Sequence, residues 1–283
     1  MSTSPPREPS VAPPPRAPAG GDGGTGRWAG IRWAVPSFVT VAVLVVIWQV
    51  YVTSSGVRPQ VLPSPLRVVQ QGWAHRAEIG THAAATLQVT LVGFAVSLVL
   101  AWTLAVIVDF SPWLRRALVP LFVASQTVPI VAIAPLMIIW FGFGLLPKVL
   151  VVALVTFFPM AVGLIEGFAA ADRDAGALLR SMGASRLQEF RYVRLPSALP
   201  RFFTALRIGI TYAVVGAVFA EYVGASVGLG IYMSLQKNSF RTDLVLAAVL
   251  VTALLSITLY LSTFAIERVV APWARAQNRS RGD

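Results

Sequence analysis

Apolar stretches of about 20 residues recur along the chain, and they constrain its fold more than any other feature. An α-helix needs a run of about that length to cross the hydrocarbon core of a bilayer. Hydrophobic residues make up 56% of the sequence and charged residues 12%, whereas soluble domains carry about 25% charged residues. The sequence therefore predicts an all-α, polytopic membrane protein whose helices pack against lipid and against one another.

The predicted transmembrane helices number six, at residues 33–52, 83–108, 117–140, 149–167, 199–220 and 244–266. The third contains three prolines, so we expect it to be kinked or interrupted. Short helices are predicted in the connectors, beginning near Leu66 and over residues 231–236. Residues 1–27, rich in Pro, Gly and Ser, are predicted to be a disordered tail. Residues 28–273 would form the transmembrane domain, and residues 274–283 a basic tail.

Two of the predicted spans carry small residues at every fourth position. Such stripes allow the backbones of neighbouring helices to approach closely. The second and fifth spans are therefore expected to make close helix–helix contacts. The stripes consist of Gly93, Ser97, Ala101 and Ala105, and of Ala205, Gly209, Ala213 and Ala217.

The arginines set the predicted orientation. With six spans, both termini and the connector 172–200 lie on one side of the membrane. That side receives Arg7, Arg16, Arg27, Arg32, Arg115, Arg116, Arg173, Arg180, Arg186, Arg191, Arg194, Arg201, Arg268, Arg275, Arg279 and Arg281. The other side receives Arg58, Arg67, Arg76, Lys148, Lys237 and Arg241, and Arg207 lies inside a span. Cytoplasmic loops carry the excess of basic residues, so both termini are predicted to be cytoplasmic.

Residues 172–200 form the one long polar segment between two spans, and they are predicted to fold as two short helices. Asp172 and Asp174 suit the amino end of a first helix that runs to Met182. Gly183 can end this helix, because glycine adopts the left-handed conformation at no steric cost.

The second short helix has its own start signal, since Ser185 and Gln188 have the spacing of a capping box. Leu195-Pro196 is expected to stop it, and Pro200 to open the next span. The segment is therefore predicted to be a helix–turn–helix elbow that protrudes from the membrane and is bound by a soluble partner.

The elbow resembles the cytoplasmic loop of permease subunits of binding-protein-dependent ABC importers. That loop reads Glu-Ala-Ala, three residues, Gly, nine residues, Ile, one residue, Leu-Pro. Gly183, Val193, Leu195 and Pro196 occupy this spacing, and Ala177-Leu178-Leu179 takes the place of the opening triplet. The resemblance implies that the partner ATPase couples through Ala177, Leu178, Leu179, Met182, Gly183, Ala184, Ser185, Phe190, Val193, Leu195 and Pro196.

Three further stretches resemble the sulfonate, nitrate and taurine branch of these permeases, and the whole resemblance covers residues 62–273. They are LPSP at 62–65, VPIVAIAPLMIIWFGFG at 128–144 and AEYVGASVGLG at 220–230. The resemblance implies the type I importer permease fold, a homodimer of permeases, two ATP-binding subunits and an extracytoplasmic substrate-binding protein. The implied solute is a sulfonate, taurine, nitrate or a similar anion, although relatives also carry uncharged pyrimidine precursors of vitamins.

Several kinds of chemistry are excluded. The chain has no cysteine, so it has no disulfide or thiol site. Its only lysines, Lys148 and Lys237, do not follow glycine, so there is no Walker A motif. The chain is therefore expected to bind no cofactor, with ATP and Mg²⁺ held by the partner ATPase. His75 and His82 alone do not make a metal site. The arginines lie at span ends, which argues against nucleic-acid binding.

A translocation path is expected beside the proline-broken third span and the fifth span. Candidate residues are Gln126, Thr127, Pro129, Pro135, Gly216 and Glu221. The alternative function is a secondary transporter for a small polar solute. That alternative predicts intramembrane acids and internal repeats, neither of which stands out in this sequence.

Overall fold

The computed structural model describes residues 26–272, with side chains described for residues 35–129 and 132–272. The predicted tails therefore lie outside the described residues, except that α1 (Gly26–Ser55) already begins at residue 26. By its internal contacts the chain divides into residues 1–50 and residues 51–283. The first unit contains most of α1, and the second contains every element described below.

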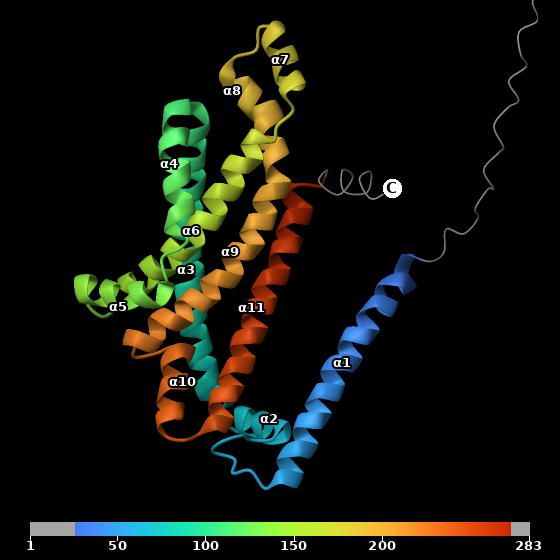
Figure 1. Ribbon diagram of the computed structural model, residues 1–283, viewed down its shortest axis with the longest axis vertical. Helices are drawn as coiled ribbons and strands as arrows, with labels where there is room; N and C mark the ends of the chain where they lie inside the picture. Colours follow the sequence, from blue (N-terminus) through green and yellow to red (C-terminus); the bar gives the residue numbers. More distant parts are fainter. Residues whose placement is uncertain (1–25, 273–283) are drawn as a thin grey trace, which may run out of the picture. The chain divides into compact units, whose positions relative to one another are not determined.

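Four long helices of the second unit are apolar enough to cross a bilayer. These are α3 (Arg76–Phe110), α6 (Leu145–Ala169), the continuous helical segment Arg186–Gly224 and α11 (Thr242–Val270). With α1 they make five candidate spans within residues 35–272. Within this second unit, α7 (Arg173–Ser181) lies at one end. The short helices α2 (Pro65–Ala74) and α10 (Leu229–Asn238) lie at the opposite end (Figure 1).

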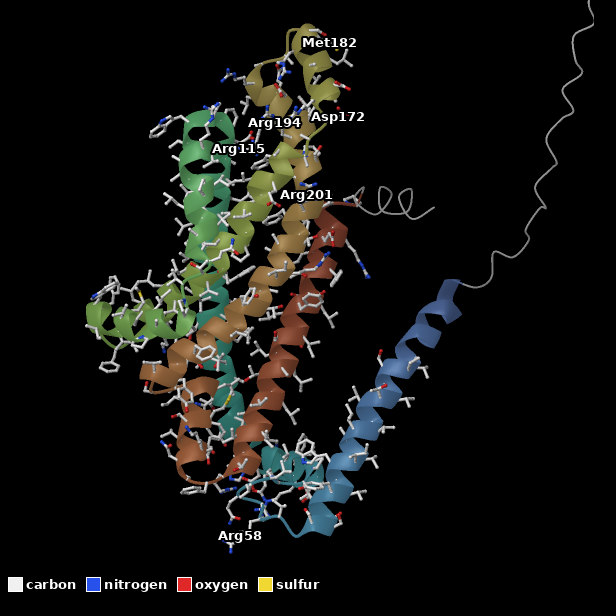
Figure 2. All side chains as sticks on the ribbon, viewed as in Figure 1. Arg58, Arg115, Asp172, Met182, Arg194 and Arg201 are labelled. Carbon is white, nitrogen blue, oxygen red and sulfur yellow. The ribbon has the colours of Figure 1, made fainter. Side chains whose placement is uncertain are left out.

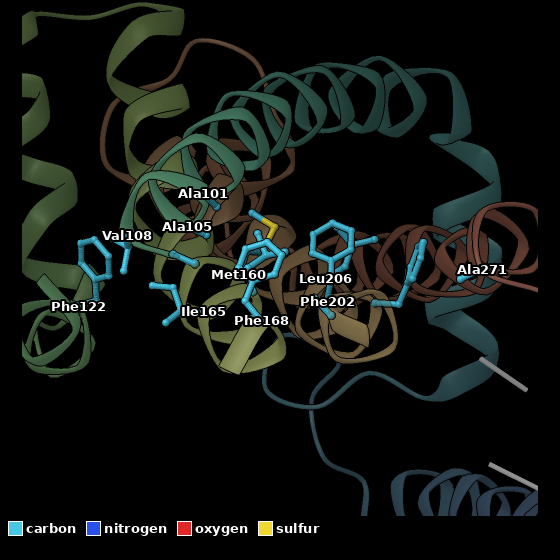
Figure 3. Close-up of a cluster of buried hydrophobic side chains, with 14 residues drawn as sticks. Ala101, Ala105, Val108, Phe122, Met160, Ile165, Phe168, Phe202, Leu206 and Ala271 are labelled. Atoms are coloured by element: carbon cyan, nitrogen blue, oxygen red, sulfur yellow. The ribbon is translucent and has the colours of Figure 1, made fainter. Parts of the chain in front are cut away.

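The core of this unit lies where α3, α6 and α9 (Leu195–Gly224) pack together (Figure 3). All residues of the two predicted small-residue stripes are buried. The helices are so close that a Cβ added at Gly163 would lie 2.4 Å from Cβ of Ala205. One added at Gly93 would lie 2.6 Å from Cβ of Val152. Close backbone approach maximises dispersion contacts, which must replace the hydrophobic effect between helices in lipid.

The predicted third span is interrupted, as its prolines indicated. It forms α4 (Pro112–Ser125) and α5 (Ile130–Phe141), separated by a break that ends at Pro129. Proline lacks an N–H group and disfavours helical geometry in the residue before it. Neither piece reaches the length of a span, and α5 turns away from the direction of α4 (Figure 1).

The prediction that Leu195-Pro196 stops the second elbow helix is wrong. Helix α8 (Arg186–Glu189) continues through a π-helical turn, η1 (Phe190–Arg194), directly into α9. The N–H of Leu195 donates to the carbonyl of Phe190, five residues earlier. The wider turn just before Pro196 lets the helix continue where an ordinary turn would clash with the proline ring. Pro200 likewise lies inside α9 and does not open it.

An ion pair connects α9 and α11. Arg207 of α9 donates a hydrogen bond to the carboxylate of Glu267 of α11. The guanidinium also lies 3.9 Å from the ring centre of Phe264. Charges within spans are expensive unless they are paired, so this contact explains how Arg207 is accommodated within a span.

Candidate functional site

The tip of the elbow is built as the sequence predicted. The side chain of Asp172 caps α7 by accepting from the N–H groups of Asp174 and Ala175, at 2.8 and 3.3 Å. Gly183 follows α7 with φ of +84°, in the left-handed region. Ser185 and Gln188 form a reciprocal capping box that starts α8. Backbone geometry and capping thus define the turn between α7 and α8.

The outer surface of the elbow carries exposed apolar side chains among its arginines. Leu178, Met182 and Leu187 are 63%, 75% and 67% exposed, and Met182 lies at the tip (Figure 2). The elbow protrudes beyond the ends of α3 and α4, away from the packed core (Figure 2). Large apolar side chains at the tip of a polar protrusion are typical of the buried centre of a protein–protein interface.

A chain of charges behind the tip connects the two short helices to the long helix α3. Glu189 is 6% exposed and accepts from Nη1 of Arg180 in α7, at 2.9 and 3.0 Å. It also accepts from Nη2 and Nε of Arg194, at 3.1 and 3.3 Å. Nη1 of Arg194 then donates to both carboxylate oxygens of Asp109, at 3.0 and 3.1 Å. Because Asp109 lies near the end of α3, the network attaches the elbow to a long transmembrane helix.

Aromatic packing strengthens the same attachment. The ring of Phe190 lies 5.4 Å from that of Phe110 in α3 and 5.2 Å from that of Phe168 in α6. Arg201 donates to the backbone carbonyl of Glu166 at 3.0 Å. The base of the elbow is therefore packed against both α3 and α6.

The sequence-predicted elbow residues are spread over the tip, the turn and the base. Ala177, Leu178, Met182 and Ser185 are exposed, Leu179 and Ala184 are half-buried, and Phe190, Val193, Leu195 and Pro196 lie half-buried at the base. Sequence reasoning did not single out Asp109, Glu189 and Arg194. The signals available in the sequence were an acidic residue at the end of the second span and a single glutamate, Glu189, in the arginine-rich segment 172–200.

A second polar cluster lies at the opposite end of the unit, around the start of α10. Gly228, Leu229 and Gly230 donate their N–H groups to Nδ1 of His82, Oγ1 of Thr86 and Oε2 of Glu221, at 3.0, 2.8 and 3.0 Å. Thr86 also donates to Glu221 at 2.8 Å. The cluster satisfies N–H groups that a helix start leaves without partners, and so fixes α10 to α3 and α9.

Glu221 is fully buried in this cluster, so it is not an interfacial carboxylate. Beside it, burial raises the pKa of Tyr232 to about 12, and the ring of Tyr232 lies 4.9 Å from that of His82. The part of the chain with described side chains contains no group of three potential metal ligands.

The other predicted path residues lie around the break between α4 and α5. Gln126 and Thr127 are exposed there, Pro129 precedes α5 and Pro135 lies within it. Gly216 is buried in α9. Of these residues, Gln126 contributes to a cavity of about 410 Å³ between α4, α5, α6 and α9.

Three features together characterise this protein: apolar spans packed through small residues, one broken span, and a protruding elbow with an apolar tip. They are the features of a polytopic membrane protein with a polar protrusion suited to contact a soluble partner. Residues 93–276 match the family model described as "Binding-protein-dependent transport system inner membrane component". The chain belongs to this family of ABC importer permeases, and it is a multi-pass membrane protein.

Two curated relatives show the range of the family. The chain is 36% identical over 235 residues to the formylaminopyrimidine transport permease protein ThiX of Halalkalibacterium halodurans, covering 83% of this chain and 94% of the relative. It is 32% identical over 255 residues to the taurine transport system permease protein TauC of Escherichia coli, covering 87% and 92%. The predicted resemblance to the taurine branch is therefore confirmed.

The fold is also that of a solved transporter. A structure described as an inward-facing conformation of the MetNI methionine ABC transporter aligns with a TM-score of 0.62, 18% sequence identity, and coverage of 70% of this chain and 98% of that one. The predicted importer permease fold is therefore confirmed.

Proposed function

We propose that this chain is the transmembrane subunit of an ATP-driven importer that moves a small solute into the cytoplasm. The elbow, residues 172–200, would receive the force of a separate ATPase. The observation that carries this proposal is the elbow itself, whose apolar tip is exposed while its base is held to α3 by the pairs of Arg194. Membership of a binding-protein-dependent family argues against the alternative of a secondary transporter.

The rest of the assembly is proposed from the family. Two copies of this chain would form the membrane pore, two ATP-binding subunits would dock on the two elbows, and an extracytoplasmic binding protein would deliver the solute. ATP and Mg²⁺ would be held by the ATPase subunits, because this sequence has no phosphate-binding loop. The permease alone would then hydrolyse no ATP.

In the proposed orientation, both termini and the elbow lie in the cytoplasm. The excess of arginines on that side supports this orientation. The cysteine-free chain allows a direct test. A membrane-impermeant thiol reagent applied to spheroplasts should label a Ser239→Cys variant beyond α10, and should leave a Met182→Cys variant unlabelled until the membrane is opened. Both positions are exposed, so equal labelling of the two variants before lysis would contradict the orientation.

The coupling role is tested at Gly183. A residue with a Cβ is disfavoured at its φ of +84° by about 1–2 kcal/mol. No neighbouring atom lies within 4 Å of an added Cβ, so the substitution acts on the backbone alone. Gly183→Val should turn α7 relative to α8 and reduce solute uptake by about tenfold, with the permease still inserted. The measurement is uptake together with copurification of the ATPase.

Gly183→Asn is the matched control, because asparagine tolerates the left-handed conformation better than valine does. Its uptake should stay close to that of the parent. Normal uptake by Gly183→Val, with the ATPase bound as before, would mean that the geometry of the turn does not matter for coupling.

The sequence resemblance and the names of the relatives support two different classes of solute. The sequence resemblance predicts an anion such as a sulfonate or nitrate, and the name of TauC agrees with that prediction. The name of ThiX instead points to a formylaminopyrimidine. The chemistry of the cavity beside Gln126 bears on this choice.

A further inference from the structure

The cavity beside the break between α4 and α5 lies at mid-height of the two long helices that border it. It is bordered by Phe158 and Pro159 near the middle of α6 and by Tyr212 and Val215 in the second half of α9. Gln126 lines the side where α4 ends. Its volume of about 410 Å³ is within the range of small-molecule sites. Proline-broken helices border solute sites at this depth in other transporters, because irregular backbone is tolerated only beside protein or a water-filled cavity.

None of the described side chains that line this cavity is charged. Arg207, the charged residue of α9 that lies nearest along the chain, is paired with Glu267. Lys148 lines a different cavity, near the start of α10, and is close enough to Glu221 for their charges to interact. An anion that entered the mid-height cavity would thus lose its hydration without gaining a cation, which is costly at low dielectric.

The lining offers two aromatic rings and uncharged polar groups. Phe158 and Tyr212 provide faces on which a flat ring can stack. The amide of Gln126 and the hydroxyl of Tyr212 can each donate and accept a hydrogen bond. Neither group has a hydrogen-bond partner among the described residues. This combination matches the edge of a heterocycle that carries both donors and acceptors.

Tyr212 also belongs to an exposed face of α9, where contact with lipid would leave its hydroxyl without a hydrogen-bond partner. Residues spaced three or four apart along this face are 39–50% exposed. They are Ile208, Tyr212, Val215, Phe219 and Tyr222. Hydrocarbon cannot satisfy a phenolic hydroxyl. The hydroxyl at the cavity therefore points to an aqueous path on this side of α9.

We propose that the cavity between α4, α5, α6 and α9 binds the transported solute, and that this solute is an uncharged, planar heteroaromatic compound. Tyr212 and Phe158 stack on its ring, and Gln126 binds its polar edge. The assignment rests on the proposed transport function, and it selects the uncharged class over the anions that the sequence resemblance favours.

Protection of a single cysteine tests the assignment without any step that needs ATP. The full-length Val128→Cys variant carries its thiol at an exposed position that lines the cavity and has no assigned contact with the solute. It is placed in nanodiscs and treated with a water-soluble maleimide. The competing probes are a formylaminopyrimidine, methanesulfonate and nitrate, each at about 10 mM. A site with a Kd of about 1 mM is then about nine-tenths occupied. The pyrimidine should slow labelling by about tenfold, and the two anions should leave the rate unchanged.

Three further variants identify the source of the protection. Tyr212→Ala in the Val128→Cys background should remove most of it, and Tyr212→Phe should retain most of it because the ring face remains. Tyr222→Ala, on the same face of α9 but away from the cavity, should leave it intact. Labelling of Ser239→Cys, beyond α10, should not respond to any probe.

The proposal is overturned if the anions protect the cysteine as well as or better than the pyrimidine does, if no probe protects it, or if the maleimide does not reach it. Labelling of the permease does not depend on the elbow or on the ATPase. A negative result here with reduced uptake for Gly183→Val would reject the solute assignment and keep the coupling role. The converse pair of results would reject the coupling role alone.

Discussion

Replacement of Arg194 by alanine should strongly reduce coupled transport while the chain still inserts into the membrane. Among the residues with described side chains, Arg194 is the one that contacts both Glu189 of the elbow and Asp109 of α3. Both carboxylates are nearly buried, with side chains 8% and 5% exposed. Without Arg194, Asp109 has no cation among the described residues, and the elbow loses its charged attachment to α3.

The expected size of this loss follows from the burial of the two carboxylates that Arg194 contacts. Removing one partner of a buried ion pair costs about 3–5 kcal/mol, because the other charge stays buried and unpaired. One third of the Arg194 side chain is exposed, so water screens part of the loss and we expect the lower end of this range. The loss is local to the base of the elbow. Solute uptake should fall by about tenfold or more, while the assembled ATPase continues to hydrolyse ATP.

Two controls separate this role from general loss of positive charge. Arg191→Ala removes a neighbouring exposed arginine for which no ion pair is described, and it should leave uptake nearly unchanged. Arg194→Lys keeps the charge but cannot contact both carboxylates with a planar fork, so its uptake should be intermediate. Coupled uptake at the parent rate in Arg194→Ala would show that the elbow transmits force without this network.

Replacement of Gly230 by alanine should lower the stability of the folded protein substantially. A Cβ at this position would lie 2.2 Å from the backbone oxygen of Val218 and 2.9 Å from the backbone nitrogen of Tyr222. Backbone atoms of α9 cannot move aside as a flexible side chain can, so α10 must shift. The N–H of Gly230 would then leave the buried carboxylate of Glu221, whose Oε1 already has no partner among the described residues.

Overpacking of this kind costs about 1–3 kcal/mol, and an unsatisfied buried carboxylate adds to it. The midpoint of thermal unfolding of the purified protein in detergent, taken at one heating rate, should therefore fall by several degrees. Gly80→Ala is the matched control. Gly80 lies inside α3 with no atom within 4 Å of an added Cβ, so alanine should stabilise the helix by about 0.5–1 kcal/mol. An unchanged midpoint for Gly230→Ala would mean that α10 is not held against α9 as described.

The sequence-based predictions that the structure confirms rest on signals a few residues long. The caps at Asp172 and Ser185, the left-handed turn at Gly183 and the small-residue stripes each depend on neighbours within about four positions. Such signals persist in the fold because local backbone geometry determines them. Apolar runs of span length are equally local, since the bilayer imposes their length.

The end of the second elbow helix shows where a local signal fails. Pro196 indicated a stop, because in an ordinary helical turn its ring clashes with the carbonyl four residues earlier. The π-helical turn at residues 190–194 removes that conflict, and it coincides with the packing of Phe190 against α3 and α6. Tertiary contacts favoured a wider turn over a broken helix, and proline alone could not predict which alternative would form.

The sequence by itself determined that this protein is a bundle of membrane helices with a basic, capped elbow on one side. The tertiary structure alone decided which charges matter. Asp109 and Arg194 are 85 positions apart, and Thr86 and Glu221 are 135 apart. Among many arginines, no local pattern distinguishes those that contact buried carboxylates, because the strength of an ion pair depends on distance and on exclusion of water. Both quantities exist only once the helices have packed.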